Sequence, residues 1–524
     1  MLPLNAASCP EQVFRYPPAM TDILLVTINA KWVHPSLALR LLKANLASLE
    51  GRAEILEFAL RQPLAEKTAP ILRARPRVLA VSVSIWNHLA TRELLAALGE
   101  AWEKEPAGKP AVVLGGPEVS WLDTGAEILR YADWVVRGEG ELVFRKLCGL
   151  LLGGGTPPGP EARERRRTEV LLELGMRGGV RAAGGKFIEA EPAGLGALKS
   201  AYRLYTREDL ERKLVYVEAS RGCPFGCEFC LSALDRRVRE FPLEPFLAEM
   251  GGLIENGARR FKFLDRTFNL NPERAAKILE FFLGKMTRPP DAGEPACVHF
   301  EMIPSPVPAK LRGLLARFKP GTLRLELGIQ TFNPVTASLV GRASDPEREL
   351  ETLEFLCRNT NAIIHADLIA GLPGEGLASF AGGFDRLWQI LSIRNTGGAA
   401  SDGSAAAGKP RAEIQLGILK RLPGAPIARH GKAYRMRYAT DPPYEVQETA
   451  ALPAGELDRL RNFARFWELI VNRGNHPDFA ARFLPPGKPA FARFMELSDR
   501  LLARFGRNWG LDRNELKAVL NEQE

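Results

Sequence analysis

Short apolar runs alternate with amphipathic stretches twice along this chain, and this repeated alternation is the strongest constraint on its fold. An apolar run suits a strand that is buried on both faces of a parallel sheet, and the amphipathic stretch after it suits a helix covering that sheet. The first series predicts strands at residues 23–27, 78–84, 111–114 and 134–136. Such an order predicts an α/β domain with an open, doubly wound, Rossmann-like sheet.

The second series begins at Leu214 and predicts a barrel. Its apolar runs predict six strands, at residues 214–220, 260–264, 297–302, 322–328, 362–368 and 411–416. Helical patterns such as 243–256 and 272–286 separate these strands. Six βα units are expected to form a partial (β/α)6 barrel, whose chemistry takes place at the carboxyl ends of its strands.

Turn signals and shifts of composition divide the chain of 524 residues into six segments. The predicted segments are a tail at 1–20, the Rossmann-like domain at 21–152, a Gly- and Pro-rich linker with some hairpin structure at 153–213, the barrel at 214–396, a flexible Gly/Ala/Ser insert at 397–410 and a largely helical C-terminal module at 411–524. Met20 directly precedes the first predicted strand, so residues 1–19 are expected to form a disordered tail or to lie before the true start.

Composition predicts a cytoplasmic protein without a membrane partner. Hydrophobic residues make up 46% and charged residues 25% of the chain, as in ordinary globular proteins. No apolar stretch reaches the roughly 18 residues that cross a bilayer, and no secretory signal is visible. Seven cysteines, three of them clustered, differ from a secreted disulfide framework and indicate a reducing compartment.

The net charge of +9 raises the question of a nucleic-acid partner. Arginine is spread through the chain, and the dense basic run at 163–167 falls in the predicted linker. A solvated basic surface is therefore the favoured interpretation, and nucleic-acid binding is the alternative.

Three cysteines lie within eight residues, directly after the first predicted strand of the barrel. Cys223, Cys227 and Cys230 are separated by three and then by two residues. Thiolates favour zinc or iron–sulfur clusters, and a structural zinc site takes four protein ligands. The next cysteine is Cys297, so three thiolates on one loop would leave one corner of a cubane cluster open for chemistry. A zinc knuckle or a disulfide pair is the alternative interpretation.

The loop Ser-Arg-Gly-Cys-Pro-Phe-Gly-Cys-Glu-Phe-Cys at 220–230 resembles the cluster loop of radical S-adenosylmethionine (SAM) enzymes. The resemblance implies that the three cysteines bind a 4Fe–4S cluster, and that the amino and carboxylate groups of SAM chelate its fourth iron. It also implies that Phe229, the aromatic residue before the last cysteine, lies against the adenine of SAM.

Small and polar residues follow the predicted strands of the first domain. They are Ser82, Ser84 and Trp86, then Gly115, Gly116, Pro117 and Glu118, then Gly138, Glu139 and Gly140. These segments resemble the cobalamin-binding domain that precedes many radical SAM cores, which implies cobalamin as a second cofactor. Small residues would let backbone amides approach the corrin closely, and the two serines could hydrogen-bond its buried tail. A Rossmann-like domain without a cofactor, or a nucleotide binder, is the alternative.

The Asp-x-His-x-x-Gly motif of methionine-synthase-like cobalamin domains is absent. Neither His34 nor His88 has an aspartate two positions before it and a glycine three positions after it. We therefore expect no histidine ligand on the lower face of cobalt, as in relatives that bind cobalamin base-off. A missing axial donor would favour four-coordinate cob(I)alamin.

Further segments match the radical SAM family in the same order along the chain. Asp265 and Thr267 lie in a segment whose backbone is implied to contact the amino group of SAM, although Arg266 replaces the family's acidic residue there. The other implied SAM contacts match later strand ends and are Glu301, Gln330 and Asp367. A carboxylate such as that of Glu301 accepts ribose hydroxyls well. For each residue a structural role is an equal alternative, and their shared order supports the family.

Residues 413–424 and 442–444 resemble a C-terminal module found in one uncharacterised subgroup of these enzymes. Gln415, Lys420 and Tyr444 are weak candidates for a substrate pocket, with core packing or a surface position as the default.

Together the resemblances imply a cobalamin-dependent radical SAM enzyme, and we expect a methyltransferase that acts on an unactivated carbon. They imply that a 5′-deoxyadenosyl radical takes a hydrogen atom from the substrate and that methylcobalamin supplies the methyl group. The expected partners are an electron donor such as flavodoxin or ferredoxin and an unknown small-molecule or peptide substrate. No catalytic side chain is assigned. The alternatives are a cobalamin-dependent rearrangement or cyclisation without methyl transfer, and an RNA-modifying or RNA-binding radical SAM protein.

Overall fold

The structure is a computed structural model that describes residues 21–105, 108–154, 160–285, 296–396 and 411–522. The predicted tail at 1–20 and the predicted insert at 397–410 lie outside the described residues. The chain separates into two compact units. The N-terminal unit runs to Val217 and includes Glu255–Ala258, and the second unit holds Glu218–Ile254 and everything from Arg259 onward.

A seven-stranded sheet forms the centre of the N-terminal unit, with the strand order β2-β1-β3-β4-β5-β7-β6. The strands are β1 (Ile23–Asn29), β2 (Ala53–Ala59), β3 (Val78–Ser82), β4 (Ala111–Gly115), β5 (Trp134–Arg137), β6 (Val180–Gly184) and β7 (Phe187–Ala190). All neighbours pair in parallel except β6 and β7. The order of the first five strands is that of flavodoxin-like, doubly wound sheets, so the predicted fold class is confirmed.

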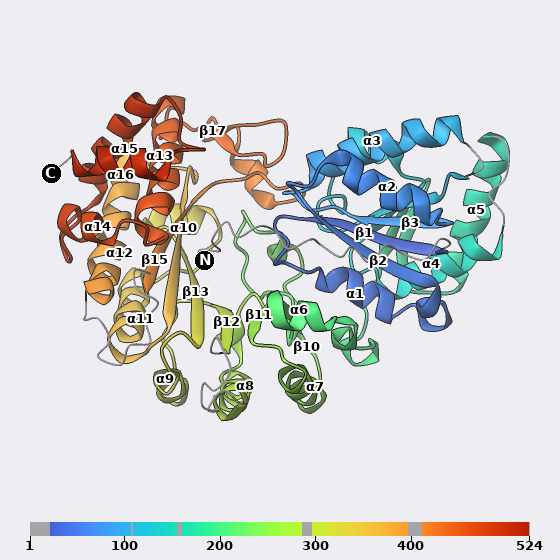
Figure 1. Ribbon diagram of the computed structural model, residues 1–524, viewed down its shortest axis with the longest axis horizontal. Helices are drawn as coiled ribbons and strands as arrows, with labels where there is room; N and C mark the ends of the chain where they lie inside the picture. The colour runs from blue at the N-terminus through green and yellow to red at the C-terminus, as the bar shows by residue number, and fades with distance from the viewer. Residues whose placement is uncertain (1–20, 106–107, 155–159, 286–295, 397–410, 523–524) are drawn as a thin grey trace. The chain divides into compact units, whose positions relative to one another are not determined.

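Helices cover both faces of this sheet (Figure 1). They are α1 (Leu37–Ala44), α2 (Leu64–Ala74), α3 (His88–Lys104), α4 (Glu141–Gly153) and α5 (Pro160–Met176). The apolar run of β1 explains the double cover, because all seven of its residues are buried. Leu25 packs in one core with Leu147 of α4, and Leu24 packs in another with Leu94 of α3. A strand buried on both faces needs such a continuous apolar run.

The strands at the two edges of the sheet were not among the four strands predicted for this domain. β2 carries the charged residues Glu54 and Glu57, so no apolar run marks it in the sequence. Charged side chains are a common feature of edge strands, because they discourage pairing with another chain. At the other edge, the hairpin expected within 153–213 is present as β6 and β7, and it adds two strands to the sheet.

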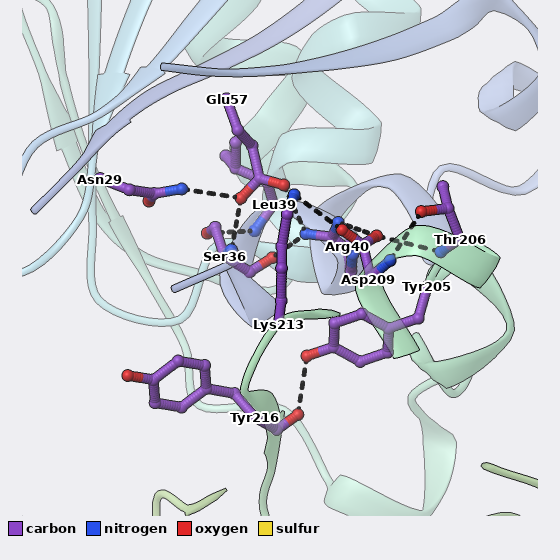
Figure 2. A network of polar contacts seen from close by, with 10 residues as sticks. All are labelled: Asn29, Ser36, Leu39, Arg40, Glu57, Tyr205, Thr206, Asp209, Lys213 and Tyr216. Carbon is purple, nitrogen blue, oxygen red and sulfur yellow. Dashed lines mark hydrogen bonds and ion pairs between the residues drawn. The ribbon is translucent and has the colours of Figure 1, made fainter. Parts of the chain in front are cut away.

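A buried charge network fastens the end of the 153–213 region to the N-terminal unit, as Figure 2 shows. Arg40 of α1 lies 2.9 Å from Glu57 of β2 and 2.8 Å from Asp209 of α6 (Arg207–Arg212). The ammonium of Lys213 also lies 2.8 Å from Asp209, and the Arg40 guanidinium lies 4.7 Å from the ring centroid of Tyr205. Removing one member of such a buried set typically costs about 3–5 kcal/mol. Residues 205–213 therefore belong to the folded N-terminal unit.

The second unit contains a parallel sheet whose strands lie in the order β15-β14-β13-β12-β11. They are β11 (Arg260–Phe263), β12 (Cys297–Met302), β13 (Leu323–Gln330), β14 (Ile363–Ala370) and β15 (Ala412–Ile418), and β8 (Val215–Val217) precedes them in the chain. The helices between them are α7 (Leu243–Glu255), α8 (Pro272–Lys285), α9 (Ala309–Ala316), α10 (Pro334–Leu339), α11 (Pro346–Asn359) and α12 (Leu377–Thr396). Consecutive parallel strands joined by helices make the predicted partial barrel.

The strands of this barrel present a polar face. On β13, Leu325 and Leu327 are buried, whereas Arg324 and Glu326, which alternate with them, are half-buried and lie on the opposite face. Helices cover the outside of a (β/α) barrel, so the charged face is the interior. Barrel interiors are commonly filled by branched apolar side chains, and this one is lined by charged and polar groups instead.

The C-terminal region is largely helical, as predicted. Its helices are α13 (Ala454–Trp467), which continues into the π-helix η9 (Glu468–Asn472), and α14 (Pro477–Phe483), α15 (Phe491–Phe505) and α16 (Arg513–Asn521). The rings of Phe463 and Trp467 lie 5.2 Å and 4.8 Å from that of Phe384 on α12, so the aromatic stripe of α13 packs on the barrel. Among the described residues, no helix combines the length and the apolar character that crossing a membrane would require.

Candidate functional site

The cysteine loop is held at its base by a short antiparallel hairpin of the second unit. β9 (Ser220–Arg221) leads into the loop and pairs with β10 (Arg239–Glu240) after it. Gly222 follows β9 with a φ of +93°, and a Cβ there would lie 2.0 Å from the carbonyl oxygen of Arg237. Only glycine fits such a turn, so the Arg-Gly-Cys sequence sets the direction in which the loop leaves the hairpin.

The three cysteine thiols of the loop are free and lie near one another. The backbone N–H of Cys230 donates to the carbonyl of Cys227 at 3.0 Å. Burial raises the pKa of Cys227, and the neighbouring Cys230 and Cys223 raise it further, while a hydrogen bond and the positive charge of Arg342 oppose the rise. Thiolates that repel one another in this way are stabilised when each binds a metal atom.

The chemistry of this donor set fits a cubane cluster. In the described ranges, no group of three or more His, Cys, Asp or Glu side chains is placed as the ligands of a single metal ion. A 4Fe–4S cluster makes a different demand, because each of its thiolates binds a separate iron. Three soft donors on one glycine-shaped loop therefore have the chemistry that such a cluster needs.

Two of the predicted SAM residues lie beside the cysteine loop. Asp265, directly after β11, accepts hydrogen bonds from the Ser220 hydroxyl at 2.6 Å and from the Ala219 N–H at 2.9 Å. Burial raises the pKa of Asp265 to about 6, although these hydrogen bonds favour its ionised form. The hydroxyl of Thr267 lies 3.6 Å from the sulfur of Cys223. Asp265 thus braces the strand that opens into the loop, and Thr267 contacts its first cysteine.

The other predicted SAM residues lie on the barrel strands, apart from Phe229, which is half-buried in the loop. Arg266 lies 3.6 Å from Glu301 on β12, and burial raises the pKa of Glu301. Gln330 ends β13 with a φ of +70°, and its side-chain nitrogen occupies the space where a Cβ on Gly328 would lie. A strained backbone of this kind is typical of ligand sites.

Asp367 faces Gly328 across the parallel pair of β14 and β13. Burial and the nearby charges of Glu326 and Glu301 raise the pKa of Asp367 well above its ordinary value. Within the described parts of the chain, its Oδ1 atom is buried and has no hydrogen-bond partner. The structure thus brings Glu301, Gln330 and Asp367 to one polar face of the barrel.

A second layer of this interior was missed by the sequence analysis. Glu326 lies 3.1 Å from His299 and 3.2 Å from Lys262. Burial opposes the ionisation of Glu326, but these two neighbours lower its pKa to about 2. His365 contacts the Gln415 amide through Nδ1, and its buried Nε2 finds no partner among the described residues. Part of the signal was present, since polar residues recur with a period of two on single strands, as His299 and Glu301 do on β12 and His365 and Asp367 do on β14.

The predicted cobalamin residues of the N-terminal unit lie at the carboxyl ends of β3, β4 and β5. Asn87, which was not among the predicted cobalamin residues, links the carboxyl end of β3 to that of β1. Its side chain accepts from the Ser84 N–H at 2.8 Å, and it donates to the carbonyls of Ile28 at 2.9 Å and Ser82 at 3.3 Å. A fully buried amide with this many partners fixes the loop that carries Ser82, Ser84 and Trp86.

Glycines shape the same edge after β4 and β5. Gly116 has a φ of +101°, and a Cβ there would lie 2.6 Å from the carbonyl oxygen of Val83. Gly138 has a φ of +82° and donates its N–H to the Ser120 hydroxyl at 3.3 Å. Gly140 caps α4, and Gly115 ends β4. These glycines form a cradle in which backbone groups could approach a ligand closely.

The remaining cobalamin candidates differ in exposure. Glu118 is buried and lies 2.8 Å from Nδ1 of His88, whereas Pro117 is exposed and Glu139 is half-buried. His34, the other histidine considered, contacts the Tyr216 hydroxyl through its Nδ1 at 2.9 Å. Both histidines therefore use Nδ1 in a hydrogen bond to another side chain of the protein.

Exposed tryptophans line the same edge. Trp32, Trp86 and Trp121 follow β1, β3 and β4, which are neighbours in the sheet, and they are 37%, 54% and 48% exposed. Exposed aromatic side chains at one sheet edge are candidates for a binding surface. Trp32 and Trp121 were not predicted, because their neighbours in sequence resemble no motif. The edge thus combines a glycine cradle with flat apolar surfaces, which fits a large planar ligand such as the corrin of cobalamin.

Comparisons with known proteins agree with both sites. Residues 217–385 match the family described as the radical SAM superfamily, and residues 23–148 match the B12 binding domain. The chain therefore carries a radical SAM domain and, ahead of it, a B12-binding domain. These two families imply a 4Fe–4S cluster, SAM and cobalamin as cofactors.

Curated relatives match part of the chain. An uncharacterized methyltransferase of Pyrococcus horikoshii is 34% identical over 179 residues, 32% of this chain and 36% of the relative. The cobalamin-dependent radical SAM methyltransferase TokK of Streptomyces tokunonensis is 27% identical over 205 residues, 38% of this chain and 28% of TokK. The match thus spans about a third of each relative's length.

A solved structure shares the fold along most of the chain. The cobalamin-dependent S-adenosylmethionine radical enzyme OxsB, with aqua-cobalamin and S-adenosylmethionine bound, aligns with a TM-score of 0.59 and 14% identity. The alignment covers 94% of this chain and 76% of OxsB. At this identity the likeness concerns the fold alone.

Proposed function

We propose that the protein is a cobalamin-dependent radical SAM methyltransferase that methylates an unactivated carbon of a polar small molecule or peptide. One observation carries the proposal: a loop with three free thiols and a sheet edge shaped by glycines and bordered by exposed tryptophans occur in the same chain. Relatives named as methyltransferases support it. When bound, the cofactors would supply a carbon-centred radical and a transferable methyl group.

The chain's own residues hold and orient these groups. Cys223, Cys227 and Cys230 would bind the cluster, and Asp265 would keep their loop in place through Ser220. Phe229, Thr267, Glu301, Gln330 and Asp367 are the proposed SAM contacts. The loops after β3, β4 and β5 would hold cobalamin through Ser82, Ser84, Trp86, Gly115, Gly116, Pro117, Glu118, Gly138, Glu139 and Gly140. No side chain is needed as a general base, so positioning is the protein's main contribution.

The barrel interior supports a polar substrate. Lys262, Glu326, His299 and His365 form a layer of charged and hydrogen-bonding groups on its inner face. Within the described residues, Nε2 of His365 and Oδ1 of Asp367 are buried without a hydrogen-bond partner, and a lipid-like substrate would leave them so, which costs about 1–3 kcal/mol for each buried group. A substrate with donors and acceptors of its own would satisfy them.

The test uses anaerobic protein reconstituted with iron, sulfide and hydroxocobalamin. It is incubated with methyl-deuterated SAM, reduced flavodoxin or dithionite, and either a small-molecule extract or a peptide digest. We expect 5′-deoxyadenosine, S-adenosylhomocysteine and a product whose mass carries the deuterated methyl group. 5′-Deoxyadenosine without S-adenosylhomocysteine would remove methyl transfer and leave the rearrangement or cyclisation alternative. Labelled methyl groups on added tRNA would favour the RNA-modifying alternative.

A further inference from the structure

Glu228 lies in the cysteine loop between Cys227 and Cys230, yet its carboxylate is bound by residues about two hundred positions later. Arg429 donates through Nε at 2.8 Å to one carboxylate oxygen and through a second nitrogen to the other. Nε2 of His430 lies 2.9 Å from Glu228 Oε2. Glu228 and His430 are each 8% exposed, whereas the Arg429 side chain is exposed. An acid in the loop thus has a buried and an exposed partner on one distant segment.

The backbone of Glu228 is held as firmly as its side chain. The N–H of Ile427 donates to the Glu228 carbonyl at 2.9 Å, and Ile427 belongs to the short 3-10 helix η8 (Pro426–His430). The N–H of Glu228 donates in turn to the carbonyl of Val340 at 2.9 Å, at the end of α10. These bonds join three segments that are far apart in the sequence. Outside its hairpin base the loop has no regular strand to support it, so such bonds decide its shape.

A second contact pins the loop beside Glu228. Arg342 hydrogen-bonds to Cys227 and also to the Gly328 carbonyl on β13, so it links a predicted cluster ligand to a barrel strand. Gly341 has a φ of +64°, and a Cβ there would lie 2.7 Å from the carbonyl oxygen of Gly226. The turn after α10 therefore lies directly against the loop between two of its cysteines.

We propose that the η8 segment positions the cluster-binding loop through Glu228, and that the Glu228 carboxylate is a fixed charge that tunes a cluster bound there. This inference rests on the cluster-binding part of the proposed function. It gives the C-terminal module a role beyond packing on the barrel: Arg429 and His430 are positioning residues that act through Glu228. Partners of this kind typically change metal affinity by about 10–100-fold when removed.

The charges predict the direction of each effect. The reduction potential of an iron–sulfur cluster depends on the local charge, on hydrogen bonds and on exposure to solvent. Glu228→Gln removes a buried negative charge and should raise the potential. Arg429→Gln removes a positive charge and should lower it, by less, because the Arg429 side chain is 66% exposed and water screens its charge. A purely structural role would not give opposite signs.

The experiment measures midpoint potential by EPR-monitored titration of anaerobic, reconstituted full-length protein, with iron and sulfide content determined in parallel. We expect a higher potential for Glu228→Gln, a lower one for Arg429→Gln, a value near the wild type for Arg429→Lys, and loss of iron for Glu228→Ala. Arg437→Gln is the matched control, since Arg437 is an exposed arginine of the same module that pairs with Glu448, far from the loop in sequence. Shifts of one sign for both charge variants, or none, would overturn the proposal.

A measurement on the apo protein covers variants that fail to take up a cluster. Modification of Cys223, Cys227 and Cys230 by a thiol reagent, followed by mass spectrometry, reports how well the loop is held. We expect faster modification in Glu228→Ala and His430→Ala than in the wild type and in Arg437→Gln, and equal rates would overturn the positioning role. If the wild type itself binds no iron and sulfide, the proposed function fails. If the wild type binds a cluster and the variants keep the wild-type potential and modification rates, only the present inference fails.

Discussion

Nδ1 of His88 lies 2.8 Å from Oε1 of Glu118, and both side chains are buried at the carboxyl edge of the N-terminal sheet. His88 is the first residue of α3 after β3, and Glu118 follows β4. The pair therefore joins the two loops that carry Trp86 and Gly116. A buried carboxylate that loses its partner typically costs about 1–3 kcal/mol. The shape of the proposed cobalamin edge thus depends on an interaction that neither loop can make alone.

The first prediction tests this pair. His88→Phe keeps a ring of similar size but removes the hydrogen bond to Glu118. We expect the free energy of unfolding of the N-terminal unit to fall by about 1–3 kcal/mol, because a hydrogen bond to a buried carboxylate is lost. Hydroxocobalamin binding, followed by its visible absorption, should weaken. Glu118→Gln with wild-type His88 keeps the hydrogen bond and should change less. Unchanged stability and affinity in His88→Phe would show that the pair is dispensable.

The second prediction concerns Gly116. Alanine there would meet the Val83 carbonyl at 2.6 Å in a backbone conformation that L-residues rarely adopt. We expect Gly116→Ala to cost about 1–3 kcal/mol of stability and to weaken cobalamin binding, because the loop after β4 must shift. Gly125→Ala is the matched control, since nothing lies within 4 Å of a Cβ at that position and its φ is ordinary. Equal stability and equal cobalamin affinity of the two variants would contradict the proposal that Gly116 shapes the cobalamin site.

The third prediction concerns the exposed tryptophans. Half of the Trp86 side chain is available for contact with a flat ligand. Burial of that surface is worth about 1–2 kcal/mol, so Trp86→Ala should weaken hydroxocobalamin binding by about 10-fold, and Trp86→Phe by less. Trp509→Ala removes a tryptophan that is 65% exposed in the second unit and should have no effect. An equal loss in both alanine variants would point to general destabilisation rather than to contact.

The fourth prediction concerns the cysteines. Replacement of Cys223, Cys227 or Cys230 by Ala should remove the thiolate-to-iron absorption of anaerobically reconstituted protein, since each thiolate is expected to bind its own iron. Cys297→Ala is the control, because burial raises the pKa of that thiol and it lies outside the loop. It should keep the wild-type iron and sulfide content. A loop variant that retained all of its iron would refute the ligand assignment for that cysteine.

The alternation of strands and helices in both units could be predicted, because a strand buried on both faces leaves a continuous apolar run. β1 and β3 were found in this way, and β2 was missed because it is an edge strand with glutamates along it. The cysteine loop and the glycines at strand ends could also be predicted, because their chemistry is local to a few neighbouring residues.

The parts of the site that were missed depend on partners far along the chain. Asn87 matters because it reaches Ile28, and Glu228 matters because Arg429 and His430 reach it. No periodicity or motif marks such pairs in one sequence. The inner barrel layer is different: His299 and Glu301 on β12, and His365 and Asp367 on β14, alternate with buried residues, so the period of two could have revealed them.

The last prediction is a pH dependence that arises from Asp265. Burial raises its pKa from 3.8 to about 6, so between about pH 4 and pH 6 the folded protein holds a proton that the unfolded chain has released. The contribution of this group to the free energy of unfolding therefore falls as the pH rises through that window, by up to about 3 kcal/mol. Asp265→Asn cannot ionise and should lack this component.

The measurement is urea unfolding of the apo wild type and Asp265→Asn from pH 4 to pH 7, with the difference in unfolding free energy taken at each pH. We expect wild type minus variant to decline up to about pH 6 and then to level off. Glu326→Gln is the contrasting control: the pKa of Glu326 is lowered to about 2, so its contribution is lost only as the pH falls below about 4.5. A difference that stayed constant or rose with pH for Asp265→Asn would show that the hydrogen bonds from Ser220 and Ala219 outweigh burial, and that Asp265 braces the cysteine loop as a carboxylate throughout.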